Sequence, residues 1–246
     1  NAAVGRDALT ANTTGTQNVA VGALSLDANT TASYNTAMGH AALSACTTGA
    51  GNTAVGQISQ DDVTTGAQNT AIGAGSGHAL TTGSANTSLG YLANSNNTTG
   101  NHNISLGFSA NPSTTTASAQ FTMGDANITN LRCNDTSISA LSDSRDKTDV
   151  IDSPYGLDLI NTVRPVQFKW ETRDGNGKDG STRVGFLAQE LLAATDGNNA
   201  VLDLVLDDNP EKLEAKYGNL VPIMAQAIKE LSAKNDALEA RLTTLE

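Results

Sequence analysis

A serine and a lysine five residues apart are the residues of this chain whose types and spacing could carry out covalent chemistry. They bound the polar segment Ser142-Asp143-Ser144-Arg145-Asp146-Lys147. A serine hydroxyl is a weak nucleophile and needs a neighbouring base. A lysine amine can be that base only if burial or nearby cations lower its pKa. Because Ser142 directly follows Leu141, its hydroxyl could attack the Leu141 carbonyl within the chain. Such proximity can lower the activation barrier by roughly 7–11 kcal/mol.

Two other charged residues of the segment could support this chemistry. Arg145 or backbone N–H groups could stabilise the oxyanion that forms at the attacked carbonyl. Asp143 could orient Lys147 or simply cap a turn. The alternative is that the segment is only a polar loop, as most hexapeptides of this composition are.

The segment lies between two halves of different composition. Residues 1–140 carry only eight charged side chains, and the remaining 106 residues are densely charged. Such asymmetry usually marks two modules with different packing. The formal net charge of −11 gives neither a nucleic acid nor an anionic membrane surface electrostatic support as a partner. No apolar run approaches the roughly 20 residues that span a bilayer, so we expect no membrane insertion.

The first half is an array of short repeats with a constant period. Glycines recur every 17 residues, from Gly5 to Gly124, within the motif Asn-x-Ala/Ser-apolar-Gly, and Thr-Thr-Gly or Thr-Thr-Ala precedes most of the Asn residues. A fixed short period indicates stacked coils that bury apolar faces on their neighbours. Seventeen residues suit two short strands with two turns. The array is in phase at Asn1, so we expect it to continue upstream in the parent protein.

We therefore predict that residues 1–128 form a mainly β repeat array, a parallel β-solenoid or β-roll. The apolar residue of each motif should form an internal ladder, made by Val4, Val21, Met38, Val55, Ile72, Leu89, Leu106 and Met123. Each coil has few large apolar side chains, and ordering costs roughly 1–2 kcal/mol per residue. Three chains packed side by side would bury more surface than one. Residues 129–141 break the period but still read as short β segments, and we treat them as a β connector.

Residues 142–246 have the composition of an α+β module. We predict a helix from about Asp152 to Val163, strands over 166–170, 183–186 and 201–206, and a helix over 187–192. The segment 173–181 reads as a hairpin turn. The alternative, a calcium loop, lacks a glutamate at its twelfth position, Gly185.

The last helix, about 219–246, carries a heptad repeat. Its heptad positions are spaced alternately three and four residues apart, and all but Asn235 are apolar: Val221, Met224, Ile228, Leu231, Asn235, Leu238, Leu242 and Leu245. An Asn at a core position of a coiled coil specifies register and the number of chains, which makes Asn235 a candidate register residue. The alternative is an amphipathic helix that packs on its own domain.

No residue set predicts a cofactor or a metal. Cys46 and Cys133 fit no metal-ligand spacing, and His40, His78 and His102 occupy different phases of the repeat. The repeat face could bind a ligand, but it lacks a cluster of charged or aromatic residues.

The second half carries a series of motifs in order: Ser142-Asp143-x-Arg145-x-Lys147, Tyr155-Gly156-Leu157-x-x-Ile160, Arg164-Pro165-Val166 with Phe168 and Trp170, Gly185-Phe186-Leu187-Ala188-Gln189-Glu190, and Tyr217 to Glu230. With these motifs it resembles the self-cleaving intramolecular chaperone domain at the C-terminus of phage endosialidase-type tailspikes and tail fibres. One departure is that Asp146 and Thr148 flank Lys147 where the family usually has Leu and Lys-Lys. The repeats of the first half resemble fibre shafts and the β-roll heads of trimeric adhesins.

The resemblance implies a homotrimeric phage fibre segment whose C-terminal domain directs trimerisation and register. It further implies one cleavage of the Leu141–Ser142 bond by a Ser142–Lys147 dyad, as a single-turnover serine endopeptidase and not a general protease. Such a protein would assemble in the host cytoplasm and sit on the virion, facing a glycan or protein receptor on the host surface. Two alternatives stay open: a β-roll surface adhesin, and a trimerisation cap that is never cleaved.

Overall fold

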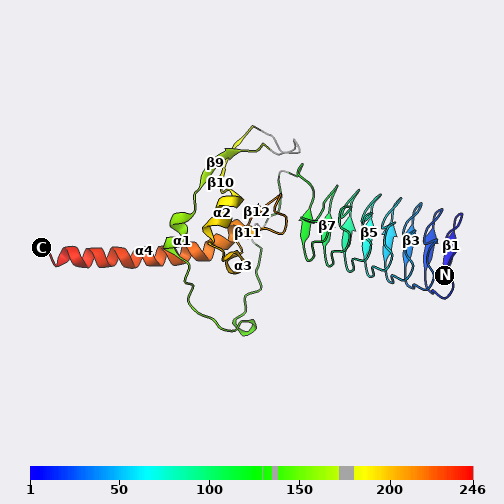
Figure 1. Cartoon of the computed structure of the whole chain (residues 1–246), viewed down its shortest axis with the longest axis horizontal. Coiled ribbons are helices and arrows are strands. Elements are labelled where there is room, and N and C mark those ends of the chain that lie inside the picture. Colours follow the sequence, from blue (N-terminus) through cyan, green and yellow to red (C-terminus); the bar gives the residue numbers. More distant parts are fainter. Residues whose placement is uncertain (129, 135–137, 172–179, 246) are drawn as a thin grey trace. The chain divides into compact units, whose positions relative to one another are not determined.

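The computed structural model describes residues 1–128, 130–134, 138–171 and 180–245. The chain divides into two compact units, residues 1–129 and residues 130–246. Figure 1 shows the first unit as a stack of short strands and the second as a small α+β body from which a long helix extends.

The first unit is a parallel β-solenoid, as the repeat predicted. Eight three-residue strands form one sheet in the order β1 to β8, and each residue pairs with the one 17 positions later. The strands are β1 (Ala2–Val4), β2 (Val19–Val21), β3 (Thr36–Met38), β4 (Thr53–Val55), β5 (Thr70–Ile72), β6 (Thr87–Leu89), β7 (Ile104–Leu106) and β8 (Phe121–Met123).

Each coil has one strand, so the expectation of two strands per repeat was wrong. After each of the first six motif glycines the segment cannot extend, because two of its residues adopt a positive φ, for example Leu24 (60°) and Leu26 (51°). The left-handed region is costly for residues other than Gly. It is held here by backbone hydrogen bonds between coils, such as the one from Leu26 N–H to the Ala42 carbonyl at 3.1 Å.

Only glycine can occupy the last position of each motif, because of its backbone conformation and because the next coil lies close to it. Gly56 has φ of 138°, and a Cβ there would lie 2.5 Å from the carbonyl oxygen of Gly73. Only glycine permits both features. The 17-residue spacing of glycine therefore reflects the contact between one coil and the next.

The motif asparagines form a buried ladder that joins successive coils. The Asn52 side-chain oxygen accepts the backbone N–H of Asn69 at 2.9 Å, and its amide donates to the Gly66 carbonyl at 2.9 Å. The same two bonds recur from Asn18 to Asn103. Only a short side chain that both donates and accepts can make this pair of bonds, which explains why the repeat keeps Asn.

The predicted internal ladder of large apolar residues was wrong. In each strand the middle residue points inward and its two neighbours point outward, so Ala20, Ala37 and Ala54 are fully buried while Val21 and Met38 are 36% and 45% exposed. Alternation along a strand requires this, because the apolar residue follows the buried alanine directly. The interior instead holds residues from the turns, including Leu26, Leu43, Cys46, Val63 and Leu80.

The second unit has three helices and two antiparallel strand pairs around a core of Leu191, Leu204, Val205 and Ile223, with a long C-terminal helix. The predicted fold class is confirmed by this architecture. Its elements are η1 (Ser144–Asp146), α1 (Leu157–Thr162), β9 (Val166–Lys169), β10 (Thr182–Gly185), α2 (Ala188–Ala194), α3 (Asn199–Leu202), β11 (Val205–Leu206), β12 (Glu214–Ala215), η2 (Tyr217–Asn219) and α4 (Leu220–Thr243).

Several predicted boundaries in this half were wrong. Helix α1 begins at Leu157 because Gly156 has φ of −149° and ψ of −123°, and because the Ser153 hydroxyl accepts the N–H of Tyr155 in a turn. Residues 199–202 form α3, which ends at Asp203 in the left-handed region, so the predicted strand shortens to β11. The turn and calcium-loop interpretations of 173–181 fall almost wholly on residues 172–179, outside the described residues.

The connector contains no strand in its described residues, 130–134 and 138–141, contrary to the predicted β segments. These residues have lost the repeated Asn and Gly that bond one coil to the next. Among the described helices, none is long and apolar enough to cross a membrane.

Candidate functional site

The structure brings Ser142 and Lys147 into direct contact. The Lys147 ammonium group donates a hydrogen bond to the Ser142 hydroxyl at 2.5 Å. Between them lies η1, a single turn that reverses the chain. In an extended chain, residues 142 and 147 would lie much farther apart than a hydrogen bond. The turn therefore brings the Ser142 hydroxyl and the Lys147 side chain together.

Asp143 begins that turn. Its carboxylate accepts the backbone N–H of Arg145 at 2.9 Å and the Arg145 guanidinium at 3.0 and 2.6 Å. The hydrogen bonds from Arg145 hold the pKa of the Asp143 carboxyl below its usual value. Of its two predicted roles, Asp143 therefore takes the cap, because its carboxylate bonds to the backbone and the guanidinium of Arg145 and not to Lys147. Arg145 in turn is occupied by this ion pair.

The pair and its surroundings are exposed in the single chain. Residues 138–154 are all exposed, and Leu141 on the acyl side of the candidate scissile bond is fully so, at 104%. Ile138, Val150 and Ile151 are also 77–95% exposed. A lysine acts as a base only where burial or cations favour its neutral form. The single chain thus supplies the geometry of a dyad without the burial that its chemistry needs.

Other motif residues of the second half meet in pairs that hold this unit together. The Glu230 carboxylate on α4 accepts the first N–H of α1, that of Leu157, at 2.8 Å, and this bond holds the pKa of Glu230 below its usual value. Arg164 and Glu190 form an ion pair through two hydrogen bonds. The Tyr217 hydroxyl accepts the N–H of Phe186 at 3.2 Å.

The roles of Glu230 and Tyr217 were missed by the sequence reasoning. Both explain a nearby glycine, because a Cβ on Gly156 would lie 2.2 Å from the Glu230 carboxylate and one on Gly185 would lie 2.7 Å from the Tyr217 hydroxyl. The isolated glycines in these motifs were the available signal, since such a glycine often marks the close approach of another group.

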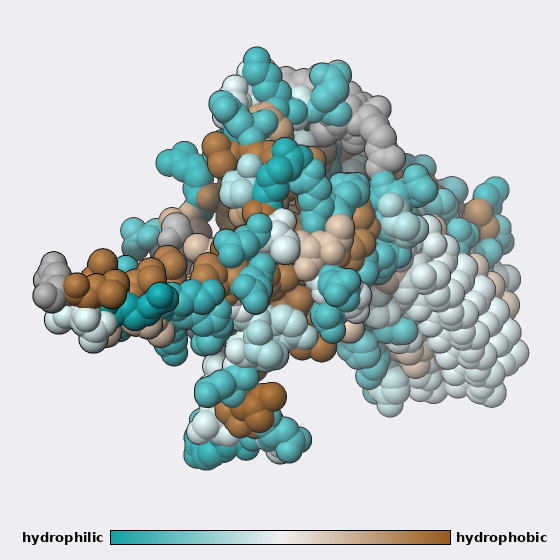
Figure 2. All heavy atoms as spheres, turned by 60° about the vertical axis from the view of Figure 1, so that its left-hand side comes forward, coloured by the Kyte–Doolittle hydropathy of each residue, from teal (hydrophilic) through white to brown (hydrophobic). Residues whose placement is uncertain are grey.

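Helix α4 has two apolar faces. Leu220, Ile223 and Ala227 are buried against the second unit at 4–5% exposure. The heptad residues from Val221 to Leu242 lie on another face and are 49–66% exposed. Figure 2 shows hydrophobic side chains along the helix end that projects from the unit. The interpretation as an amphipathic helix that packs on its own domain is therefore confirmed for the buried face, and the coiled coil stays a prediction for the exposed heptad face.

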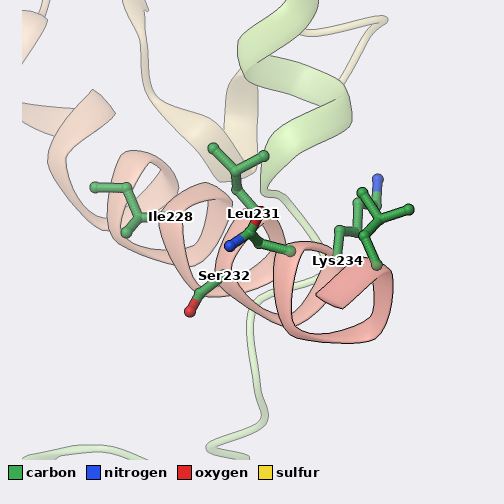
Figure 3. Close-up of a pocket in the computed structure, with 6 residues that line it drawn as sticks. Ile228, Leu231, Ser232 and Lys234 are labelled. Atoms are coloured by element: carbon green, nitrogen blue, oxygen red, sulfur yellow. The ribbon is translucent and has the colours of Figure 1, made fainter. Parts of the chain in front are cut away.

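The exposed heptad face forms a shallow apolar groove along α4. Ile228, Leu231, Ser232, Lys234, Asn235 and Leu238 line it, and Figure 3 shows the four labelled side chains projecting from one stretch of the helix. Asn235 lies among these apolar residues and donates from its side-chain amide to Glu239 at 3.1 Å. Its position fits a register residue at a helix–helix seam.

The solenoid also exposes a continuous apolar surface. The outward residues of β1 to β8 include Val4, Met38, Ile72, Leu89 and Met123 at 43–64% exposure, and no outward strand residue is charged. Tyr91 and Phe108 stack on adjacent coils with ring centroids 5.6 Å apart, so the array does carry an aromatic pair, contrary to expectation.

The side chains that could bind a metal ion are those of His, Cys, Asp and Glu. In the described part of the chain no three His, Cys, Asp or Glu side chains cluster as metal ligands. His78 pairs with Asp61 in the neighbouring coil at 2.5 Å. Cys46 is buried and Cys133 exposed, both as free thiols, and burial raises the pKa of Cys46 to about 11.

The described chain thus combines a repetitive parallel β-solenoid with an α+β unit that ends in a long helix with an exposed heptad face. Residues 142–202 match the family model described as chaperone of endosialidase. The match begins at Ser142 and ends within α3. Together, the chaperone-of-endosialidase domain and the solenoid fit a tail fibre with a C-terminal chaperone. Comparisons with curated proteins and with solved structures gave no significant match.

Proposed function

We propose that the chain is part of a phage tail fibre or tailspike, in which residues 142–246 direct homotrimer assembly and then release themselves by cutting the Leu141–Ser142 bond. The observation that carries the proposal is the 2.5 Å contact between Lys147 and Ser142 at the first residue of the family match. The fibre would lie on the virion and meet a glycan or protein receptor of the host.

The chemistry is an acyl transfer followed by hydrolysis. Lys147 in its neutral form takes the proton of the Ser142 hydroxyl while that oxygen attacks the Leu141 carbonyl carbon. The C–N bond breaks, and Lys147 returns the proton to the leaving Ser142 nitrogen. Water then hydrolyses the ester, which leaves a carboxylate on Leu141 and restores the hydroxyl on Ser142. One turnover cuts one chain.

Assembly is needed because the single chain leaves the dyad exposed. Partner copies that cover Ile138, Val150 and Ile151 would remove water from the same segment. Burial favours the neutral amine. Cleavage would therefore follow assembly and not precede it.

A self-similar array explains why the fibre needs a template. Every coil offers the same 17-residue spacing and a similar uncharged outer face, so three chains shifted by one coil would bury nearly the same surface. The heptad face of α4, with its single Asn235, sets one register at one end. Cutting afterwards removes the template and leaves the fibre kinetically trapped.

Intact mass under denaturing conditions tests the cleavage. The wild-type chain should give two fragments that meet between residues 141 and 142, whereas Ser142→Ala and Lys147→Met should stay whole. Ser144→Ala is the matched control, because it changes a neighbouring serine of the same exposed turn and should still cleave. Whole chains in all four samples would contradict the proposal.

A second candidate is a permanent trimerisation cap. The exposure of Lys147 and its neighbours favours it, since the single chain does not bury the base. Whole wild-type chains that still sediment as trimers would establish this second function.

A further inference from the structure

The interior of the solenoid changes chemical character along one column of residues. The column takes the fourth residue after each of the first six motif glycines, namely Leu9, Leu26, Leu43, Gln60, Gly77 and Asn94. All six have a positive φ between 51° and 65°. Backbone bonds from Gln60 N–H to Ser76 O, from Gly77 N–H to Ala93 O and from Asn94 N–H to Ala110 O stack these residues in adjacent coils.

The first part of this column is apolar and the last part is polar. Leu26 and Leu43 are fully buried in the apolar core. Gln60 and Asn94 occupy the same interior positions at 1% and 0% exposure. Gly77, between them, has no side chain, and a Cβ there would lie 3.2 Å from Gln60 Cγ, 3.8 Å from Ala71 Cβ and 4.0 Å from the hydroxyl of Ser88. Gly77 thus interrupts the column of large side chains next to Gln60.

Several of these polar groups are unsatisfied. Gln60 Oε1, both Asn94 amide atoms and the Ser105 hydroxyl are buried, and no hydrogen-bonding group of the described residues pairs with them. Ser105 is the inward residue of β7, 1% exposed. Each such group costs roughly 1–3 kcal/mol. Native proteins commonly satisfy such groups with buried water, which makes about three hydrogen bonds.

We propose that the coils around Gly77 enclose at least one ordered water molecule, bound by Asn94 and Gln60. The water accepts a hydrogen bond from the Asn94 amide nitrogen and donates to Gln60 Oε1. Water fits this set better than a cation, because a cation cannot accept the N–H of Asn94 and no buried carboxylate lies in this column. The solenoid would then have a dry interior in its first coils and a hydrated one in its later coils.

The test restores the leucine column. Water ¹⁷O magnetic relaxation dispersion counts long-lived buried water, and it is measured on the full-length Ser142→Ala chain with and without Gln60→Leu, Gly77→Leu and Asn94→Leu together. Leucine already adopts φ of 51–57° at this column, so the variant should fold, lose at least one long-lived water per chain and melt at a higher temperature. The matched control is Gln68→Leu, which is exposed and has φ of 59°; it should keep the water signal.

Equal dispersion amplitudes in the parent and the leucine-column variant would overturn the proposal. If that variant does not fold, a high-resolution crystal structure of the parent decides the matter. A density peak within 3.2 Å of both Asn94 Nδ2 and Gln60 Oε1 is expected, and direct pairing of these side chains without such a peak would overturn the proposal.

Discussion

The asparagine ladder makes a sharp prediction at Asn52. Replacing Asn52 by Ala removes the acceptor for the Asn69 N–H and the donor for the Gly66 carbonyl, both at 2.9 Å. The Asn52 side chain is fully buried, so water cannot replace these bonds without opening the coils. Two unsatisfied backbone groups at roughly 1–3 kcal/mol each give an expected loss of about 2–6 kcal/mol in the free energy of unfolding.

The matched control is Asn1→Ala at the open end of the same ladder. Asn1 makes the same two bonds, to Gly15 at 2.8 Å and from Asn18 at 2.9 Å, but it is exposed. Water can satisfy its partners, so the loss should stay below about 1 kcal/mol. Native-state hydrogen exchange of the solenoid backbone amides, measured at increasing urea, reports on the solenoid alone. Equal losses from Asn52→Ala and Asn1→Ala would refute the reasoning that burial, and not the bond count, gives the ladder its strength.

Three further predictions concern single side chains. The hydrogen bond that His78 donates to the Asp61 carboxylate raises the pKa of His78 above its usual value. This stabilisation should be complete below about pH 6.5 and lost as pH rises through the folded pKa, so the urea midpoint of the wild type should fall with pH relative to that of His78→Gln; parallel curves would contradict it. Gly156→Ala should destabilise the second unit as much as Glu230→Ala does, because a Cβ at 2.2 Å displaces that carboxylate; additive losses in the double variant, seen by thermal melting, would count against this. Asn235→Leu should raise the melting temperature of the oligomer but give mixed oligomer sizes by native mass spectrometry, and a single unchanged size would remove Asn235 as the register residue.

The repeat and the order of elements could be predicted because both are local patterns. A glycine every 17 residues determines the coil period, since a Cβ would collide with the next coil at 2.5 Å. Whether the apolar residue of each strand faces the interior or the solvent could not be predicted in the same way. It depends on whether Ala20 or Val21 faces inward, and a one-residue difference along a strand reverses the two faces. In the closed coil Ala20 faces inward and is fully buried, while Val21 faces outward and is 36% exposed; the alternating pattern alone allows either choice.

The candidate site was predictable in its residues but not in its surroundings. The spacing of Ser142 and Lys147 suggested the contact that η1 creates. The exposure of the segment was not apparent, because burial depends on what packs over a chain and not on its own sequence. Likewise, Glu230 caps α1 although it lies 73 residues away from Leu157 in the sequence. A contact over such a separation cannot be predicted from a local sequence pattern.

The order of assembly and cleavage tests the central claim most directly. Native mass spectrometry of the wild-type chain during refolding, sampled over time, separates monomers from trimers and whole chains from cut ones. The account predicts whole-chain trimers first, then trimers of residues 1–141 with released residues 142–246, and no cut monomers at any time. Cut monomers before trimers, or trimers that stay whole indefinitely, would contradict it.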